Sequence, residues 1–188
     1  MRNSLTTALT ALVAAALIIP VATPAQAAEK TQPTQNLRGS VVSDDLFGLH
    51  VKDEQNGVWP TIKFGSLRLW DNGTAWSNIE TSKGVFDWTN LDNAVANAEK
   101  NGMDDILMVL SGTPSWATDQ RNPSALPQPD ASGMPRNLKD WDDWVRAVAT
   151  RYKGRINNYQ HWNEANLTTF ITGTPAQMAE LTKRAYDI

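Results

Sequence analysis

The 188-residue sequence contains no cysteine, which excludes disulfide bonds, thiolate nucleophiles and cysteine-ligated zinc sites. It also lacks a cluster of basic residues. The 17 Lys and Arg are scattered among 20 Asp and Glu, for a formal net charge of −3, so the electrostatic footprint of a nucleic-acid-binding protein is missing. We therefore expect a core held together by packing alone and an uncharged partner rather than nucleic acid.

Several catalytic signatures are also absent. The two histidines, His50 and His161, are far apart in sequence and form no HxH or HExxH motif, which argues against a metal hydrolase. There is no GxSxG elbow of a serine hydrolase and no glycine-rich nucleotide-binding loop. We expect neither a metal ion nor a cofactor.

The first 27 residues resemble a secretory signal peptide. Arg2 precedes an apolar run, and the small-residue triplet Ala25-Gln26-Ala27 follows it. The alternative is a membrane anchor, but the run has only about a dozen residues against the ~20 that span a bilayer. We therefore predict a secreted protein that leaves the membrane once the signal is removed. Residues 28–43, rich in Thr, Gln and Pro, are predicted to be a disordered linker.

The remaining residues, 44–188, show alternating strand and helix patterns. Apolar residues at three- and four-residue steps predict helices over 90–100, over 138–153 and from Pro175 to the chain end. Short apolar runs predict strands over 46–51, 66–70, 106–110 and, on weaker composition, 156–162. Trp141 and Trp144 lie on the apolar stripe of the second helix and are expected in the core.

Capping signals mark the helix starts. Asn137 is placed to cap the helix over 138–153. Thr89 with Asp92, and Thr174 with Gln177, have the spacing of capping boxes.

This order of elements predicts an α/β protein with a parallel sheet. The connections from strand to helix are long, whereas those from helix to strand are a few residues, as in a (β/α)₈ TIM barrel whose active site lies at the C-terminal ends of the strands. A complete barrel needs about 250 residues. We therefore predict that residues 44–188 hold about the first four βα units, the N-terminal half of such a barrel.

At the end of the fourth predicted strand the chain reads Trp162-Asn163-Glu164. This motif resembles the clan A glycoside hydrolases. The segments 67–71, 84–88 and 112–116 are similar to the family 39-type enzymes of that clan, which include xylosidases and iduronidases. The resemblance implies that Glu164 is the general acid/base and that Asn163 binds the 2-hydroxyl of a sugar. The alternative for Glu164 is a surface residue that caps a loop.

A retaining glycosidase needs two carboxyl groups about 5 to 5.5 Å apart. The resemblance places the nucleophile at the end of the seventh strand, outside this sequence, and Asp71 is expected to make only a local hydrogen bond or to be solvated. We predict a secreted glycoside hydrolase acting by a retaining mechanism on O-glycosidic bonds of poly- or oligosaccharides. The chain alone is expected to be inactive. The alternative is a secreted, non-catalytic carbohydrate-binding protein on a barrel scaffold.

Arg68 is a second candidate. Strand alternation places its side chain opposite those of Leu67 and Leu69, toward the barrel interior. The resemblance implies that this arginine steadies the carboxylate of the nucleophile. A surface ion pair between Arg68 and Asp71 is the alternative.

The eight tryptophans are the compositional oddity. Trp70, Trp76 and Trp116 lie at or just beyond strand ends, where an aromatic face can stack on a pyranose. We predict that Trp116 binds substrate and that Trp76 contributes, with core packing as the alternative for Trp70 and Trp76. His50 ends the first strand and either binds a sugar hydroxyl or packs internally, whereas His161 is expected to be structural.

Overall fold

The computed structural model describes residues 42–43 and 46–188. The chain divides into Met1–Ser40 and Val41–Ile188, and only the second unit contains described residues. The predicted signal peptide and nearly all of the predicted linker lie outside the described residues. In the part of the chain that is described, no helix has the length and apolar character needed to cross a membrane.

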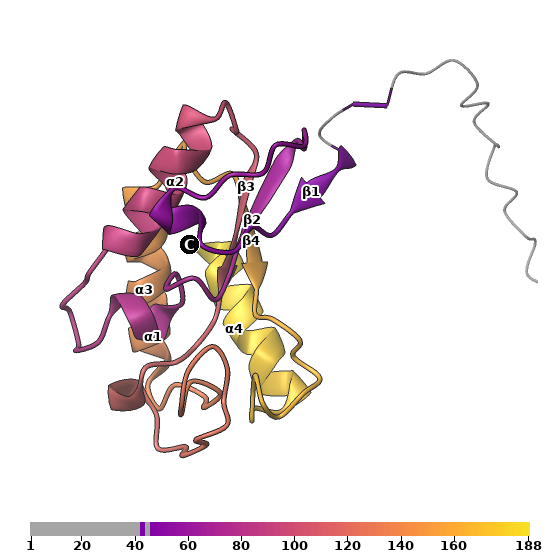
Figure 1. Cartoon of the computed structure of the whole chain (residues 1–188). Helices are drawn as coiled ribbons and strands as arrows, with labels where there is room; N and C mark the ends of the chain where they lie inside the picture. The colour runs from indigo at the N-terminus through magenta and orange to yellow at the C-terminus, as the bar shows by residue number, and fades with distance from the viewer. Residues whose placement is uncertain (1–41, 44–45) are drawn as a thin grey trace, which may run out of the picture. The chain divides into compact units, whose positions relative to one another are not determined.

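The described residues form one four-stranded sheet in which every neighbouring pair of strands is parallel (Figure 1). Its order follows the chain: β1 (Gly48–Leu49), β2 (Ser66–Leu69), β3 (Ile106–Leu110) and β4 (Asn158–His161). The predicted β3 is confirmed residue for residue, and the weaker prediction for β4 is also confirmed. β1 is shorter than predicted because only two of its residues pair with β2.

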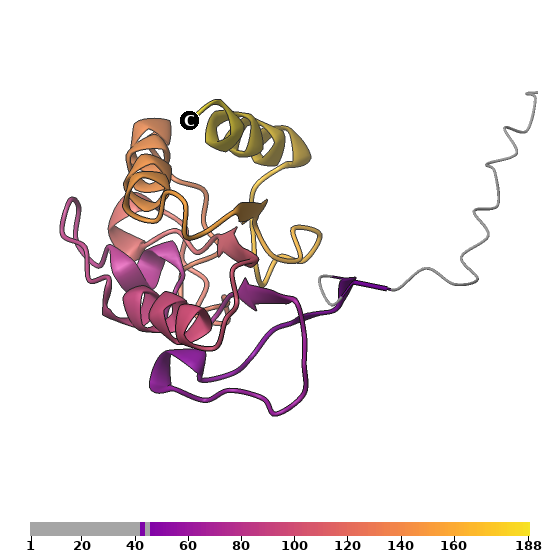
Figure 2. The ribbon, with the colours of Figure 1, turned by 90° about the horizontal axis from the view of Figure 1, so that it is seen from above.

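Three helices cover one face of this sheet in chain order (Figures 1 and 2). They are α2 (Thr89–Lys100), α3 (Leu138–Arg151) and α4 (Pro175–Asp187). A shorter helix, α1 (Trp76–Ile79), follows β2, and the connection from β1 to β2 holds only the 3₁₀ turn η2 (Glu54–Asn56). Parallel strands alternating with helices on one side are the arrangement of consecutive units of a (β/α)₈ barrel.

Two of the three predicted helix caps are confirmed. The side chain of Asn137 accepts a hydrogen bond from the Lys139 N–H at the start of α3. At the start of α4, Thr174 and Gln177 form a reciprocal capping box. Each cap satisfies backbone N–H groups that have no partner within the helix.

The capping box predicted for Thr89 and Asp92 is wrong. Thr89 is the first helical residue of α2, and the carboxylate of Asp87 accepts its N–H at 3.0 Å. Asp92 instead binds Arg151 on α3, with Arg151 Nη2 and Asp92 Oδ2 2.5 Å apart. A strong charge partner on the neighbouring helix thus replaces the local backbone partner.

The core lies between the sheet and the helices and is rich in tryptophan. Trp76 has no exposed surface, stacks on Trp144 at 6.2 Å and meets Trp141 edge to face at 5.8 Å. The expectation that Trp141 and Trp144 are core residues is confirmed. The prediction that Trp76 binds substrate is wrong, because α1 directs the ring into the helix layer, where it offers no face to a sugar.

Candidate active site

The other face of the sheet carries the polar candidates. Leu67 and Leu69 are fully buried toward the helices, and Arg68 between them lies on the opposite face, as strand alternation predicts. In the sheet register Arg68 pairs with Leu107, and two residues further along β3 Val109 pairs with Gln160. Arg68 and Gln160 therefore share this face.

Arg68 connects β2 to the end of β4. Its Nε donates to Gln160 Oε1 at 3.0 Å, and its Nη2 donates to Asn163 Oδ1 at 2.8 Å. Among the described carboxylates, none forms an ion pair with this guanidinium. Burial lowers the pKa of Arg68, and the charges of Asp71 and Glu164 oppose that change.

The chain makes a sharp turn directly after β4. Trp162 and Glu164 both have left-handed backbone conformations, with φ of 64° and 41°, which cost of order 1–3 kcal/mol each in non-glycine residues. The Trp162 ring is buried, and its Nε1 donates to the Phe170 carbonyl at 2.7 Å. This anchor leaves Asn163 buried against Arg68 and Glu164 exposed.

Glu164 therefore projects from the C-terminal end of β4 into solvent. Its side chain accepts a hydrogen bond from Asn163, whose Nδ2 lies 3.3 Å from Glu164 Oε2. The structure thus brings Arg68, which strand alternation placed on the interior face, together with Asn163 and Glu164 of the motif.

His50 lies at the same end of the sheet. Its Nε2 is 3.1 Å from Asp71 Oδ1 and 2.9 Å from the Trp70 carbonyl. The Arg68–Asp71 ion pair considered from the sequence is therefore not formed, because Asp71 is paired with His50. His50, Arg68 and Gln160 all line one hollow of about 310 Å³, which offers hydrogen-bonding groups but, among the described residues, no group of acids and histidines that could hold a metal ion.

The tryptophan beside this cluster is Trp70, not Trp116. The Arg68 guanidinium carbon lies 5.8 Å from the centre of the Trp70 ring. Trp116, in the turn η3 (Ser115–Ala117), is half-buried, meets Trp76 edge to face at 6.0 Å and donates from Nε1 to the Glu80 carbonyl at 2.7 Å. Trp116 thus contacts α1 and the residue that directly follows it.

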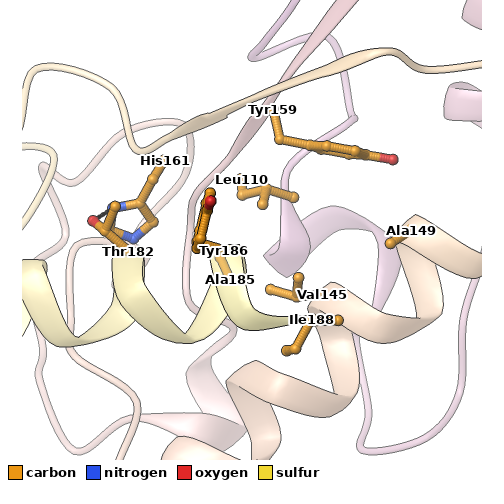
Figure 3. A pocket seen from close by; sticks show the side chains of 9 residues that line it. All are labelled: Leu110, Val145, Ala149, Tyr159, His161, Thr182, Ala185, Tyr186 and Ile188. Carbon is orange, nitrogen blue, oxygen red and sulfur yellow. Dashed lines mark hydrogen bonds between the residues drawn. The ribbon is translucent and has the colours of Figure 1, made fainter.

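His161 and Tyr159 point away from the site. Figure 3 shows both side chains directed toward α3 and α4, where they line an apolar pocket of about 400 Å³. His161 Nδ1 lies 2.5 Å from Thr182 Oγ1, whose hydroxyl donates to the Met178 carbonyl, so Nδ1 carries the proton. Burial lowers the pKa of His161 to about 4. The neutral ring and its contacts fit the structural role expected from the sequence.

One buried acid near the site was missed by sequence reasoning. Glu54 in η2 is fully buried, and its carboxyl contacts the Nδ2 of Asn72, which also donates to the Val51 carbonyl at 2.9 Å. These contacts tie the loop after β1 to the loop after β2. In the sequence Glu54 lies among polar residues typical of an exposed turn, so no local signal indicates its burial.

Burial raises the pKa of Glu54 to about 7, and the nearby charges of Asp71 and Asp53 act in the same direction against the hydrogen bond from Asn72. Because the folded pKa exceeds the unfolded one, the native state binds more protons between about pH 4.5 and 7. We expect the free energy of unfolding to fall by about 2–3 kcal/mol across this interval, since each unit of pKa difference is worth about 1.4 kcal/mol. Glu54→Gln should remove most of that fall, as measured by denaturant unfolding at pH 5 and pH 8.

Glu99→Gln is the matched control, since Glu99 is an exposed acid whose pKa is lowered by its hydrogen bond with Arg155. Glu99 is ionised in both the folded and the unfolded state above about pH 5, so its contribution to the free energy of unfolding is constant there. The Glu99→Gln variant should therefore keep the wild-type change in unfolding free energy between pH 5 and pH 8. An unchanged pH dependence in Glu54→Gln would show that Glu54 is ionised throughout.

The sequence model for "Glycosyl hydrolase family 10" matches residues 50–172. Among solved structures, the crystal structure of xylanase B from Clostridium stercorarium F9 is 19% identical with a TM-score of 0.49. The match covers 74% of this chain and 46% of that one, so the chain spans less than half the length of that structure. Clan A is confirmed, but the family 39-type resemblance is wrong, because family 10 is a different family of the clan.

Proposed function

Because the chain belongs to glycosyl hydrolase family 10, we propose that it supplies the acid/base half of a secreted glycoside hydrolase acting on poly- or oligosaccharides. The observation that carries this proposal is the arrangement at the end of β4. There Glu164 is exposed beside the Asn163 amide, and Asn163 is itself held by Arg68.

In the proposed retaining mechanism Glu164 acts twice. As an acid it gives its proton to the glycosidic oxygen while the bond from that oxygen to the anomeric carbon breaks and a carboxylate nucleophile bonds to the carbon. As a base it then takes a proton from the water that displaces the nucleophile. Asn163 is suited to hold a sugar hydroxyl, because its oxygen is occupied by Arg68 and its Nδ2 remains a donor.

The nucleophile is proposed to come from outside this chain. Arg68 supports this, since among the described residues its guanidinium donates hydrogen bonds only to neutral amide oxygens, and it could also hold a carboxylate. We call this chain together with the polypeptide that supplies the second carboxylate the complete enzyme. The proposed site takes a carbohydrate, with His50 and Arg68 contributing to the sugar-facing hollow.

Two measurements test the proposal. Sequencing the reading frame beyond codon 188 should reveal a glutamate about 80 to 150 residues after Glu164, a distance of roughly three βα units. The complete enzyme should release reducing sugars from a panel of polysaccharides that includes xylan. Binding of those polysaccharides without hydrolysis would favour the non-catalytic carbohydrate-binding alternative.

The proposed sugar contact of Trp116 has its own test. Trp116 lies in the turn η3 that follows β3 and is only half-buried, so it stays a proposed sugar contact although Trp70 lies nearer to Arg68. If this proposal is right, Trp116→Ala should weaken binding of oligosaccharides to the complete enzyme by about tenfold, or 1.4 kcal/mol. Calorimetric titration measures the affinity, and thermal unfolding measures stability. A stability loss of several kcal/mol with unchanged affinity would assign Trp116 to the core through its contacts with Trp76 and Glu80.

A further inference from the structure

Gln160 on β4 makes two hydrogen bonds that meet at the candidate site. Its Oε1 accepts from Arg68 Nε at 3.0 Å, and its Nε2 donates to the Trp162 carbonyl at 2.7 Å. Arg68 can only donate and a carbonyl can only accept, so these partners determine the orientation of the amide. One side chain thus contacts both the guanidinium and the turn that follows β4.

That turn needs support. Trp162 and Glu164 are both in left-handed conformations, which non-glycine residues keep only where surrounding contacts over-determine them. Gln160 holds the Trp162 carbonyl, and the Trp162 ring is held by the Phe170 carbonyl. Gln160 therefore helps to set the backbone direction of the next residues, together with the Leu167 N–H that donates to the Glu164 carbonyl at 2.9 Å.

Gln160 is also connected to Glu164 through a series of side-chain contacts. Arg68, fixed at Nε by Gln160, uses Nη2 to hold Asn163 Oδ1, and Asn163 Nδ2 lies beside Glu164 Oε2. Gln160, Arg68, Asn163 and Glu164 thus form a continuous chain of contacts. These contacts connect Gln160 to Glu164 through side chains. The hydrogen bond from Gln160 to the Trp162 carbonyl connects the two residues through the backbone.

We propose that Gln160 is a positioning residue that sets the direction of the Glu164 carboxyl through Arg68 and through the turn at residues 162–164. It touches neither the sugar nor the reacting atoms in this role. The inference rests on the proposed function of Glu164 as the acid. Its consequence is that loss of Gln160 harms reactions that need proton donation more than reactions that do not.

Two substitutions break these contacts in different ways. Leu removes both, and leaves the Arg68 Nε donor without its acceptor. Glu keeps an acceptor for Arg68 but places a carboxylate oxygen against the Trp162 carbonyl, where a donor is required. Gln160→Leu and the nearly isosteric Gln160→Glu therefore perturb the turn with different effects on packing.

The test uses the complete enzyme and two aryl xylosides as probes, one with a phenol and one with a 2,4-dinitrophenol leaving group. The dinitrophenolate departs without a proton, so kcat/KM on that probe does not depend on acid assistance. We expect both variants to lose about 10- to 100-fold in kcat/KM on the phenyl probe, since small displacements of a catalytic group have effects of this size. On the dinitrophenyl probe the loss should be several-fold smaller, because that reaction depends on Gln160 only through Arg68 and the carboxylate that Arg68 is proposed to hold.

Asn158→Ala is the matched control. Asn158 lies two residues earlier on the same face of β4, but its amide binds Asp105 at the other end of the strand. The Asn158→Ala substitution should leave kcat/KM unchanged on both the phenyl and the dinitrophenyl probe. Equal losses on both probes that track a fall in Tm would show that Gln160 is merely structural, and wild-type rates in both variants would also overturn the positioning role.

If Gln160→Leu does not fold, Gln160→Glu decides by the same criterion. If that variant does not fold either, Gln160 is structural and the positioning role is rejected. A wild-type complete enzyme that cleaves neither probe nor any polysaccharide of the panel contradicts the proposed function instead. The two failures are therefore distinguishable.

Discussion

Replacing Glu164 with Gln in the complete enzyme is expected to lower kcat/KM on phenyl glycosides by about 10²- to 10⁴-fold, the usual effect of losing a general acid. The amide of the substituted side chain cannot give a proton to the leaving oxygen. The exposed side chain makes few contacts, so folding and sugar affinity should survive. Steady-state kinetics with leaving groups of different basicity measures the effect, which should be smallest for the best leaving group.

Glu180→Gln provides the control for this experiment. Glu180 is an exposed acid on α4 that pairs with Arg184 at 3.2 Å, and its loss should leave the rate unchanged. Near-wild-type rates of the Glu164→Gln enzyme on every substrate would remove Glu164 from the mechanism. A uniform loss across leaving groups would point to substrate binding rather than proton transfer.

The second large effect concerns stability. Trp76→Ala is expected to cost about 3–5 kcal/mol, as for other buried aromatic residues. The ring contacts Trp116, Trp141 and Trp144, and its Nε1 donates to the buried carboxyl of Glu80 at 2.6 Å. The variant therefore leaves both a cavity and a buried acceptor with one donor fewer. Denaturant unfolding of the full chain measures the loss.

Tyr186→Ala is the control, because 89% of the Tyr186 surface is exposed. Surface substitutions of this kind usually change stability by no more than about 0.5 kcal/mol. If Trp76→Ala were equally mild but abolished sugar binding, the ring would have to be accessible, and its assignment to the core would be wrong.

Local patterns were sufficient for much of the fold. The apolar run of β3, the caps of α3 and α4 and the alternation around Arg68 are properties of a few neighbouring residues, and the structure agrees with each. The motif Trp162-Asn163-Glu164 likewise indicated the clan, although the segments upstream of it indicated the wrong family. Short segments of similar sequence recur across a clan, whereas the family match extends over residues 50–172.

Distant partners explain what the sequence could not indicate. Asp92 was expected to cap its own helix, but Arg151, 59 residues later, binds it. A tryptophan beyond a strand end can face a sugar or the core, and only the packing of α1 against α3 places Trp76 in the core.

What the sequence by itself determined is the order of strands and helices, the faces they bury and the motif Trp162-Asn163-Glu164 at the end of β4. Only the tertiary structure decided that Gln160 holds Arg68, that Asp71 pairs with His50 and that Glu54 is buried under Asn72. The periodicity of a strand or helix is local and depends on the nearest residues. The partners of Arg68 lie 92 and 95 residues away, and they meet because the register of a parallel sheet brings separate strand ends to one edge.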